Sequence, residues 1–303
     1  MSLKEIIIEN RPNISLSSVK TYLSIIRNLG RDLGIELKTP KDIIENQKKI
    51  SELYKKLEGK IRKTRLSALI VVLDGRNKDD DTNRVIEIFR NQMMKDGASY
   101  DLEIKEQTLT DKQKEGWMEW TEIMDNYNKL SKEVNSYFKT AIELSKPQFK
   151  RAQLYVLLSC LLLIEPRRSL DYTEFKLRNE TDKDNFMEIK GRKAYFVFNT
   201  YKTAKRYGQE KIEIPTSLKT IMNKWKILNK NDYMLVSSQN KKINSTQLNT
   251  MLQDYFNRPL STSLLRHIYL SHKYKDIDLK EMEKTANNMG HSVQQMMEYV
   301  KKT

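Results

Sequence analysis

Five side chains in the second half of this 303-residue chain have the chemistry needed to break a phosphodiester bond. They are Arg168, Lys202, Arg266, His291 and Tyr299. Such a reaction needs a nucleophile, positive charge on the non-bridging oxygens and a proton for the departing oxygen. A tyrosine hydroxyl, two arginines, a histidine and a lysine can supply all three, so these residues form one candidate set.

The two arginines stand where an anion is favoured. Arg168 follows a helix end, and Asp171 lies near enough in sequence to orient its guanidinium; Arg167 is the alternative at this position. Arg266 falls in the first turns of a helix expected to begin near Ser261, where free backbone N–H groups attract anions. Two planar guanidiniums can clamp one phosphate, although either arginine alone is better explained as a surface ion pair.

Lys202 lies in the segment TYKTAKRYGQ, between two expected strands. A long side chain in such a loop can reach a departing oxygen, so we assign it as the general acid. Lys205 is its nearest competitor and a candidate DNA contact. A lone lysine in a basic hairpin is usually only solvated. The presence of the other four residues in the same chain favours a catalytic role for Lys202.

His291 is presented between two expected helices. Asp278 and Glu281 have the spacing of a capping box for the first helix, Gly290 supplies the turn out of it, and Ser292 can cap the second. His291 is therefore expected beside a helix N-terminus, where it can hydrogen-bond a phosphate oxygen. The alternative is a histidine that only satisfies a helix end.

Tyr299 is one of 15 tyrosines, so its position rather than its type makes it the candidate nucleophile. It is expected in the second turn of a helix that starts near Val293. A free phenol has a pKa near 10 and needs cations beside it to favour its anion. Arg168, Arg266 and Lys202 would supply them.

The elements that must position these residues are mainly helical, with one small antiparallel sheet, which is an α+β fold. Apolar residues at three- and four-residue spacing predict helices over about 18–33, 41–57 and 79–94, and an apolar run predicts a buried helix over 147–164. Alternation predicts strands over 186–190, 193–199 and 211–215.

The polar stretch from residue 99 to 116 reads as a connection between two domains, residues 1–108 and 109–303. The first has 21 Lys and Arg against 17 Asp and Glu, a net +4, and the second has a net +11. A basic cluster starts a helix in the first domain, and we expect this helix to lie along a DNA backbone rather than to be a solvated helix end. The cluster comprises Lys60, Arg62, Lys63 and Arg65.

A net charge of +15 favours a polyanionic partner such as nucleic acid. The single cysteine, Cys160, lies in an apolar run and excludes an intrachain disulfide and a cysteine-based zinc site. His267 and His272 have no carboxylate or cysteine cluster nearby, so we expect packing or surface roles and no metal. That apolar run is too short to span a bilayer, and the start of the chain lacks a signal-like core, which predicts a soluble intracellular protein without membrane contact.

Taken together, the motifs resemble those of the tyrosine recombinase, or phage integrase, superfamily. The segments PRRSLDYTEF, TYKTAKR, SLLRH, MGHS and EY match its Arg, Lys, His-x-x-Arg, Gly-His and Tyr pattern, and the helical first half is similar to its core-binding domain. The overall character is similar to integrase-like members from large DNA viruses and mobile elements.

The resemblance implies a two-domain clamp on double-stranded DNA, with a core-binding domain and a catalytic domain, working as a homo-tetramer on DNA. It implies that Tyr299 attacks the scissile phosphate to give a 3′-phosphotyrosyl link and a free 5′-hydroxyl, without metal or nucleotide cofactor. Ser263 stands where the family usually has a histidine and cannot carry charge, so proton transfer would depend more on Lys202.

Two other functions remain open from the sequence. A type IB topoisomerase-like enzyme shares the chemistry but relaxes DNA as a monomer. A DNA-binding protein that keeps the scaffold without catalysis is also compatible with serine at position 263.

Overall fold

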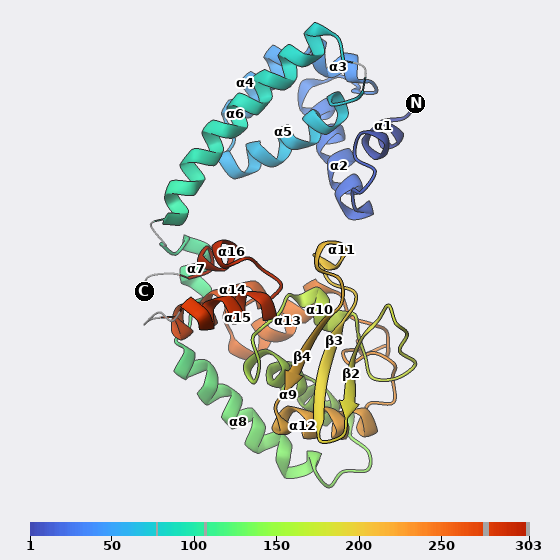
Figure 1. Ribbon diagram of the computed structural model, residues 1–303, viewed down its shortest axis with the longest axis vertical. Helices are drawn as coiled ribbons and strands as arrows, with labels where there is room; N and C mark the ends of the chain where they lie inside the picture. Colours follow the sequence, from blue (N-terminus) through green and yellow to red (C-terminus); the bar gives the residue numbers. More distant parts are fainter. Residues whose placement is uncertain (77, 106–107, 275–278, 301–303) are drawn as a thin grey trace. The chain divides into compact units, whose positions relative to one another are not determined.

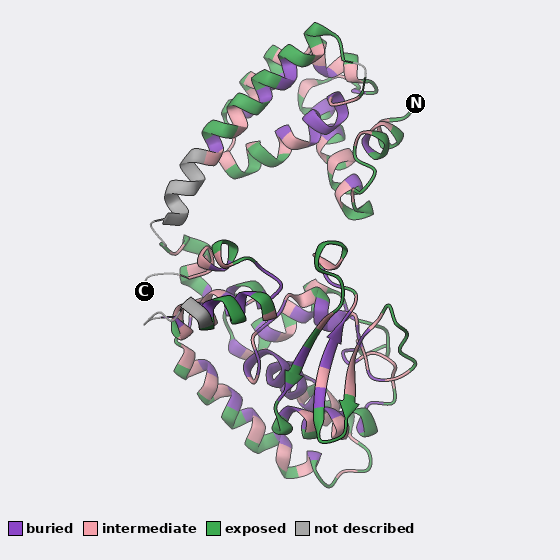
Figure 2. Cartoon of the chain, in the orientation of Figure 1, coloured by how far each residue is buried: buried purple, intermediate pink, exposed green. Residues whose placement is uncertain are grey.

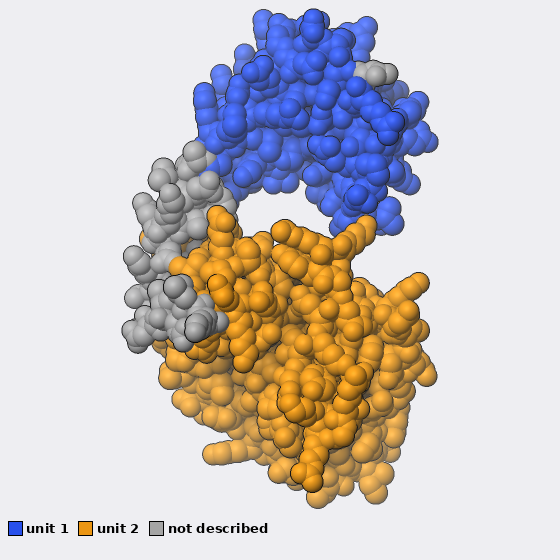
Figure 3. Space-filling model, in the orientation of Figure 1, with its two compact units in different colours: residues 1–106 blue, residues 107–303 orange. Residues whose placement is uncertain are grey.

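The computed structural model divides into two compact units, residues 1–106 and 107–303 (Figures 1 and 3). It describes residues 1–76, 78–105, 108–274 and 279–300, and for 98–105, 279 and 280 it describes the backbone only. The predicted domain boundary at residue 108 lies beside this division.

The first unit is helical, and one buried helix forms its centre. Its helices are α1 (Leu3–Asn10), α2 (Leu16–Leu33), α3 (Pro40–Glu45), α4 (Gln47–Lys55), α5 (Gly59–Leu73) and α6 (Asp80–Lys105). Helix α5 packs against α1, α2, α3 and α6. A helix contacted on several sides needs apolar residues all round it, and residues 68–73 of α5 are all buried.

Helix ends in this unit differ in places from the prediction. Helix α2 is capped by Ser15, two or three residues before the cap that the sequence predicted at Ser17 or Ser18, and Gly34 ends it in the left-handed conformation, with φ of 68°. The expected single helix over 41–57 breaks at Asn46, whose side chain donates to the carbonyl of Asp42 and so competes with the helix backbone.

Helix α6 continues to Lys105, through the first part of the stretch predicted to be a connection. Residues 101–105 include leucine, glutamate and lysine, which favour a helix. The helix therefore extends beyond the point where the apolar periodicity of the sequence is lost. Residues 106 and 107 lie outside the described part of the chain.

The second unit packs helices around a small sheet (Figure 1). Before and within the sheet come α7 (Asp111–Gly116), α8 (Trp120–Phe138), α9 (Lys146–Leu162), α10 (Ser169–Thr173) and α11 (Ala204–Tyr207). After it come α12 (Thr216–Leu228), α13 (Ser245–Phe256), α14 (Thr262–Lys273), α15 (Leu279–Asn288) and α16 (Val293–Met297). Every residue of α9 from Ala152 onward is buried, and this helix packs against α8 and α12 at the centre of the core (Figure 2).

The sheet has the order β1 (Phe175–Lys176), β2 (Asn185–Lys190), β3 (Lys193–Phe198), β4 (Glu210–Ile214). The three predicted strands are present within one residue of their expected ends, and the α+β class is confirmed. The three predicted strands pair antiparallel as expected, and a short strand that was not predicted, β1, adds a parallel pairing with β2. A two-residue strand is too short to give a periodic pattern, so the sequence could not reveal it.

A separate small core holds the last three helices together. It is built from Leu270 of α14, Tyr274 at the end of that helix, and Met282, Met289 and Met296 from α15, its C-terminal turn and α16; Tyr299 packs against it. As predicted, Gly290 turns the chain at φ 68° and Ser292 caps α16 by accepting from the Gln295 N–H. Asp278, the predicted cap of α15, lies outside the described residues.

Candidate active site

Four of the five predicted residues come together at the junction of α10, α14 and the segment after α15. Arg168 Nη2 donates to His291 Nδ1 over 3.1 Å, and Arg266 Nη1 donates to Tyr299 Oη over 3.3 Å. The rings of His291 and Tyr299 are 5.2 Å apart, and the Arg266 guanidinium lies 4.5 Å from the Tyr299 ring centre. Residues more than 120 positions apart in the chain therefore share one site.

Arg266 is almost completely buried, with 2% of its surface exposed. Its Nε and Nη2 atoms have no hydrogen-bond partner, and within the described part of the chain neither Arg266 nor Arg168 forms a salt bridge. Burial lowers the pKa of Arg266, and the nearby charge of Arg168 lowers it further, while the Tyr299 phenol opposes the shift. The arginine still stays charged at neutral pH, so it presents buried, unused donors.

The hydrogen bond from Arg168 fixes the tautomer of His291. A guanidinium can only donate, so Nδ1 accepts and the neutral ring carries its proton on Nε2. Burial, followed by the charges of Arg266 and Arg168, lowers the pKa of His291 to about 3. His291 is thus a neutral donor at physiological pH, and its buried Nε2 has no partner.

Tyr299 is half-buried and lies just after α16, rather than in the second turn of a longer helix as predicted. The helix ends at Met297, and the Tyr299 N–H donates to Met296 in the following turn. The phenol oxygen lies against Arg266, and the residue as a whole has intermediate exposure.

His267, for which the sequence predicted a packing or surface role, contacts both the backbone and the ring of Tyr299. Its Nδ1 lies 2.7 Å from the Tyr299 carbonyl oxygen, and the two rings are 4.6 Å apart. Because a carbonyl oxygen only accepts, Nδ1 must carry a proton here. His267 directly follows Arg266 in the sequence, and this adjacency is the signal that could have identified it as part of the site.

Lys202 is exposed near the start of the β3–β4 loop, and within the described residues it forms no hydrogen bond or ion pair with the other four candidates. Lys205, on the short helix α11 in the same loop, is also exposed. Both ammonium groups are therefore accessible to an outside ligand, whereas the other four candidates are gathered inside the unit.

Arg167 and Arg168 have different surroundings, and the predicted partner of Arg168 belongs to Arg167. Arg167 is fully buried, and its Nε donates to Asp171 over 2.7 Å. Burial raises the pKa of Asp171, and the charge of Arg167 opposes this rise. The expectation that Asp171 orients Arg168 was wrong, since Asp171 lies one helical turn from Arg167 and pairs with it.

Ser263 is exposed near the start of α14, three residues before Arg266. A neutral hydroxyl there can take part in a hydrogen bond but not replace a charged histidine. No contact in the described structure gives it a role beyond that.

The predicted DNA-binding cluster of α5 is not uniform. Arg62 forms a salt bridge of two hydrogen bonds with Asp96. Its Nη1 also donates to three backbone carbonyls at or just after the C-terminal end of α4, those of Tyr54, Lys55 and Leu57. These contacts join α4, α5 and α6, which argues against a phosphate contact by Arg62. Arg65 lies over the Tyr54 ring, while Lys60 and Lys63 are exposed.

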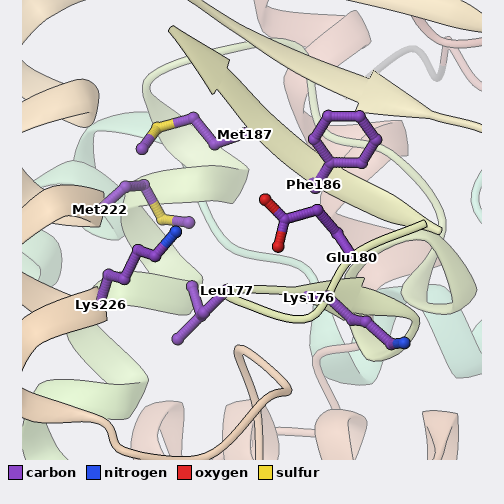
Figure 4. A pocket seen from close by; sticks show the side chains of 7 residues that line it. All are labelled: Lys176, Leu177, Glu180, Phe186, Met187, Met222 and Lys226. Carbon is purple, nitrogen blue, oxygen red and sulfur yellow. The ribbon is translucent and has the colours of Figure 1, made fainter. Parts of the chain in front are cut away.

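The hollow in Figure 4 is too small to be a ligand site. It has a volume of about 10 Å³, about the least that one water molecule needs, and is lined by residues such as Phe186, Met222 and Lys226. None of the five predicted residues lines it. Across the described ranges, no group of three His, Cys, Asp or Glu side chains is placed to hold a metal ion, and no helix has the length and apolar character of a membrane span.

No protein-family model and no curated protein matches this chain. A solved structure of a lambda integrase dimer bound to a COC′ core site is similar to it, with 13% sequence identity and a TM-score of 0.48. The match covers 98% of this chain and 77% of that chain. The functional assignment therefore depends on the site itself.

Proposed function

We propose that this protein is a site-specific DNA recombinase or integrase that cuts and rejoins DNA strands through a tyrosine-linked intermediate. The observation that carries the proposal is the group of unused donors beside a tyrosine hydroxyl. Arg266 Nε and Nη2 and His291 Nε2 are buried without partners, and Arg168 lies against the same imidazole. Buried donors left unsatisfied are costly unless a ligand uses them, and a phosphate offers the matching acceptors.

In the proposed reaction, Tyr299 Oη attacks the scissile phosphorus and the bond from phosphorus to the 5′ oxygen breaks. The products are a 3′-phosphotyrosyl link and a 5′-hydroxyl end. Arg168, Arg266 and the Nε2–H of His291 donate to the non-bridging oxygens, whose charge grows in the transition state. Attack by the 5′-hydroxyl of another strand reverses the chemistry and joins the strands.

The two proton transfers fall to different groups. Lys202 gives a proton to the departing 5′ oxygen, which its exposed position allows once DNA is bound. The Tyr299 proton leaves to water, because Nδ1 of His291 already accepts from Arg168 and Nε2 carries hydrogen. His291 therefore acts as a hydrogen-bond donor and not as a base.

Double-stranded DNA is the proposed partner, and recombination implies a homo-tetramer assembled on it. The net charge of +15 supports binding driven by phosphate neutralisation. Lys60 and Lys63 of the first unit and Lys205 of the second are the exposed candidates for backbone contacts, with Arg65 partly exposed. Such contacts would position DNA without reading its sequence.

A pool of nicked duplexes with randomised sequence around the nick tests the chemistry. Cleavage just upstream of a nick releases a short fragment and traps the covalent adduct. We expect an adduct with the wild type and with Tyr137→Phe, and none with Tyr299→Phe. No adduct from the whole pool would refute the proposal and leave a DNA-binding protein without catalysis. An adduct that survives Tyr299→Phe would refute Tyr299 as the nucleophile.

The sequences recovered from the adducts separate a recombinase from a type IB topoisomerase-like enzyme. A recombinase should enrich one core sequence and exchange strands between two matched copies of it. Relaxation of supercoiled DNA without such enrichment would identify the topoisomerase-like activity instead.

A further inference from the structure

Arg167 joins three elements of the second unit through one buried guanidinium. Its Nε donates to Asp171 of α10, and its Nη1 donates to Glu210, the first residue of β4, over 2.5 Å. The same Nη1 donates to the carbonyl of Asn288, the last residue of α15, over 2.5 Å. None of its surface is exposed, so these contacts are made away from water.

Both ends of the loop that carries Lys202 meet this guanidinium. Before the loop, the rings of Phe198 and Tyr201 lie 4.2 and 5.1 Å from it. After the loop, Glu210 forms the ion pair. Tyr201 precedes Lys202 directly, and its hydroxyl donates to the Gly208 carbonyl, which closes the loop on itself. The backbone at Lys202 is thus held through its neighbours.

The turn that carries His291 meets the same ion pair. A Cβ added at Gly290 would lie 3.3 Å from a carboxylate oxygen of Glu210 and 3.7 Å from Arg167 Nη2. The turn therefore packs directly on the Arg167–Glu210 pair, and Asn288 is hydrogen-bonded to it. One residue later comes His291, whose N–H donates to Ala286.

We propose that the Arg167–Glu210 ion pair is a positioning device that fixes the Lys202 loop relative to the His291 turn. It would set the distance between the group that protonates the departing oxygen and the groups that hold the phosphate. This inference rests on the proposed function and assigns positioning roles to two residues outside the five predicted. The positioning role uses the contacts of Arg167 Nε and Nη1, whereas Arg167 Nη2 is buried without a hydrogen-bond partner.

A purely structural ion pair would behave differently from a positioning one. Loss of a structural pair lowers the amount of folded protein and reduces every step by the same factor. Loss of positioning should reduce most the step that depends on Lys202, which is proton donation to the departing oxygen. A substrate that needs no such proton can separate the two cases.

The test compares two nicked duplexes of the sequence recovered from the pool, one with oxygen and one with sulfur at the bridging 5′ position. With oxygen, the bond to phosphorus breaks and the alkoxide takes a proton from Lys202. With sulfur, the electron pair leaves as a thiolate, which departs without being protonated first because a thiol, with a pKa of about 8.5, is far more acidic than an alcohol. The general acid then contributes little.

Glu210→Gln is the main variant, because it keeps size and hydrogen bonding but removes the charge. We expect single-turnover cleavage of the oxygen substrate to fall at least about tenfold, while cleavage of the sulfur substrate stays near the wild-type rate. Lys202→Met should show the same pattern more strongly. Arg167→Lys is the second variant, since one ammonium cannot reach all three partners in the geometry of a guanidinium.

Arg178→Met is the matched control. The Arg178 guanidinium donates to carbonyls at the end of α12, from Lys226, Asn229 and Asn231, and contacts no residue of the site. Its loss should change both substrates equally. If Glu210→Gln and Arg167→Lys also slow both substrates equally, or slow neither, the positioning role is refuted.

Failure of the proposed function gives a different result. In that case the wild type would form no adduct with either substrate. If the wild type and Lys202→Met differ only on oxygen while both ion-pair variants follow Arg178→Met, the proposed function stands and only the positioning inference fails.

Discussion

Replacing Arg266 by methionine should raise the stability of the free protein while removing most of its strand-cleaving activity. The side chain is 2% exposed and leaves Nε and Nη2 without partners. A buried unsatisfied donor costs about 1–3 kcal/mol, so two cost roughly 4 kcal/mol. Against this stand one hydrogen bond to Tyr299, about 1 kcal/mol, and a cation–π contact of roughly 1 kcal/mol.

The balance predicts a gain of about 2 kcal/mol for Arg266→Met, because methionine fills a similar space without polar atoms. For a unit of this size the melting temperature should rise by about 4–8 °C. Urea unfolding at fixed salt gives the same comparison as a free energy. Arg178→Met should lose stability instead, since its donors are used on carbonyls.

Activity should change in the opposite direction. One well-placed donor to a developing oxyanion is worth roughly 3 kcal/mol, so single-turnover cleavage should fall at least about 100-fold. Added sulfate should stabilise the wild type more than the variant, because the anion binds the free donors. A variant that loses more than about 1 kcal/mol of stability would refute the reasoning and identify Arg266 as a structural support.

Three further outcomes follow from the same contacts. Since the pKa of His291 falls from 6.5 to about 3 on folding, the unfolded chain binds a proton that the folded chain does not, and stability drops as pH falls below 6.5. Between neutral pH and about pH 5, the wild type should lose about 2 kcal/mol more unfolding free energy than His291→Asn. An equal change of the urea midpoint in both proteins over this range would contradict the pKa shift. His267→Phe keeps a ring but removes the donor to Tyr299, so cleavage should slow about fivefold with unchanged DNA affinity; a matching loss of affinity would point to a DNA contact. Arg62→Gln should destabilise the first unit, whereas Lys63→Gln should keep stability and reduce the salt slope of DNA binding by about one, and the reverse result would restore Arg62 as the phosphate contact.

The sequence predicted long, strongly patterned elements well and short ones poorly. The buried helix α9 and strands β2, β3 and β4 were located because their apolar patterns extend over several residues. The sequence did not predict the helix break at Asn46 or the parallel strand β1. Each depends on one side-chain contact or a two-residue pairing, which leaves no repeating signal.

For the site, residue types and spacing selected Arg168, Arg266, His291 and Tyr299, which lie together in the fold. The sequence could not assign Asp171, because Arg167 and Arg168 are adjacent and both lie within one helical turn of it. Only the packing decides which guanidinium turns inward. For Lys202, the flanking strands locate the loop, but among the described residues no hydrogen bond or ion pair fixes its ammonium group.

The buried and half-buried arginines of this protein differ in which groups neutralise their charge. This difference distinguishes the arginines that stabilise the fold from those proposed to bind a ligand. Arg62 and Arg167 face carboxylates, and Arg178 faces helix-end carbonyls, so folding itself satisfies their charge. Arg168 and Arg266 form no salt bridge in the described structure, and burial together with the charge of Arg168 lowers the pKa of Arg266. Keeping two such cations together opposes folding, and an anion bound between them would recover the cost. A phosphodiester beside Tyr299 meets that requirement, which is why stability and catalysis should respond in opposite directions when either cation is removed.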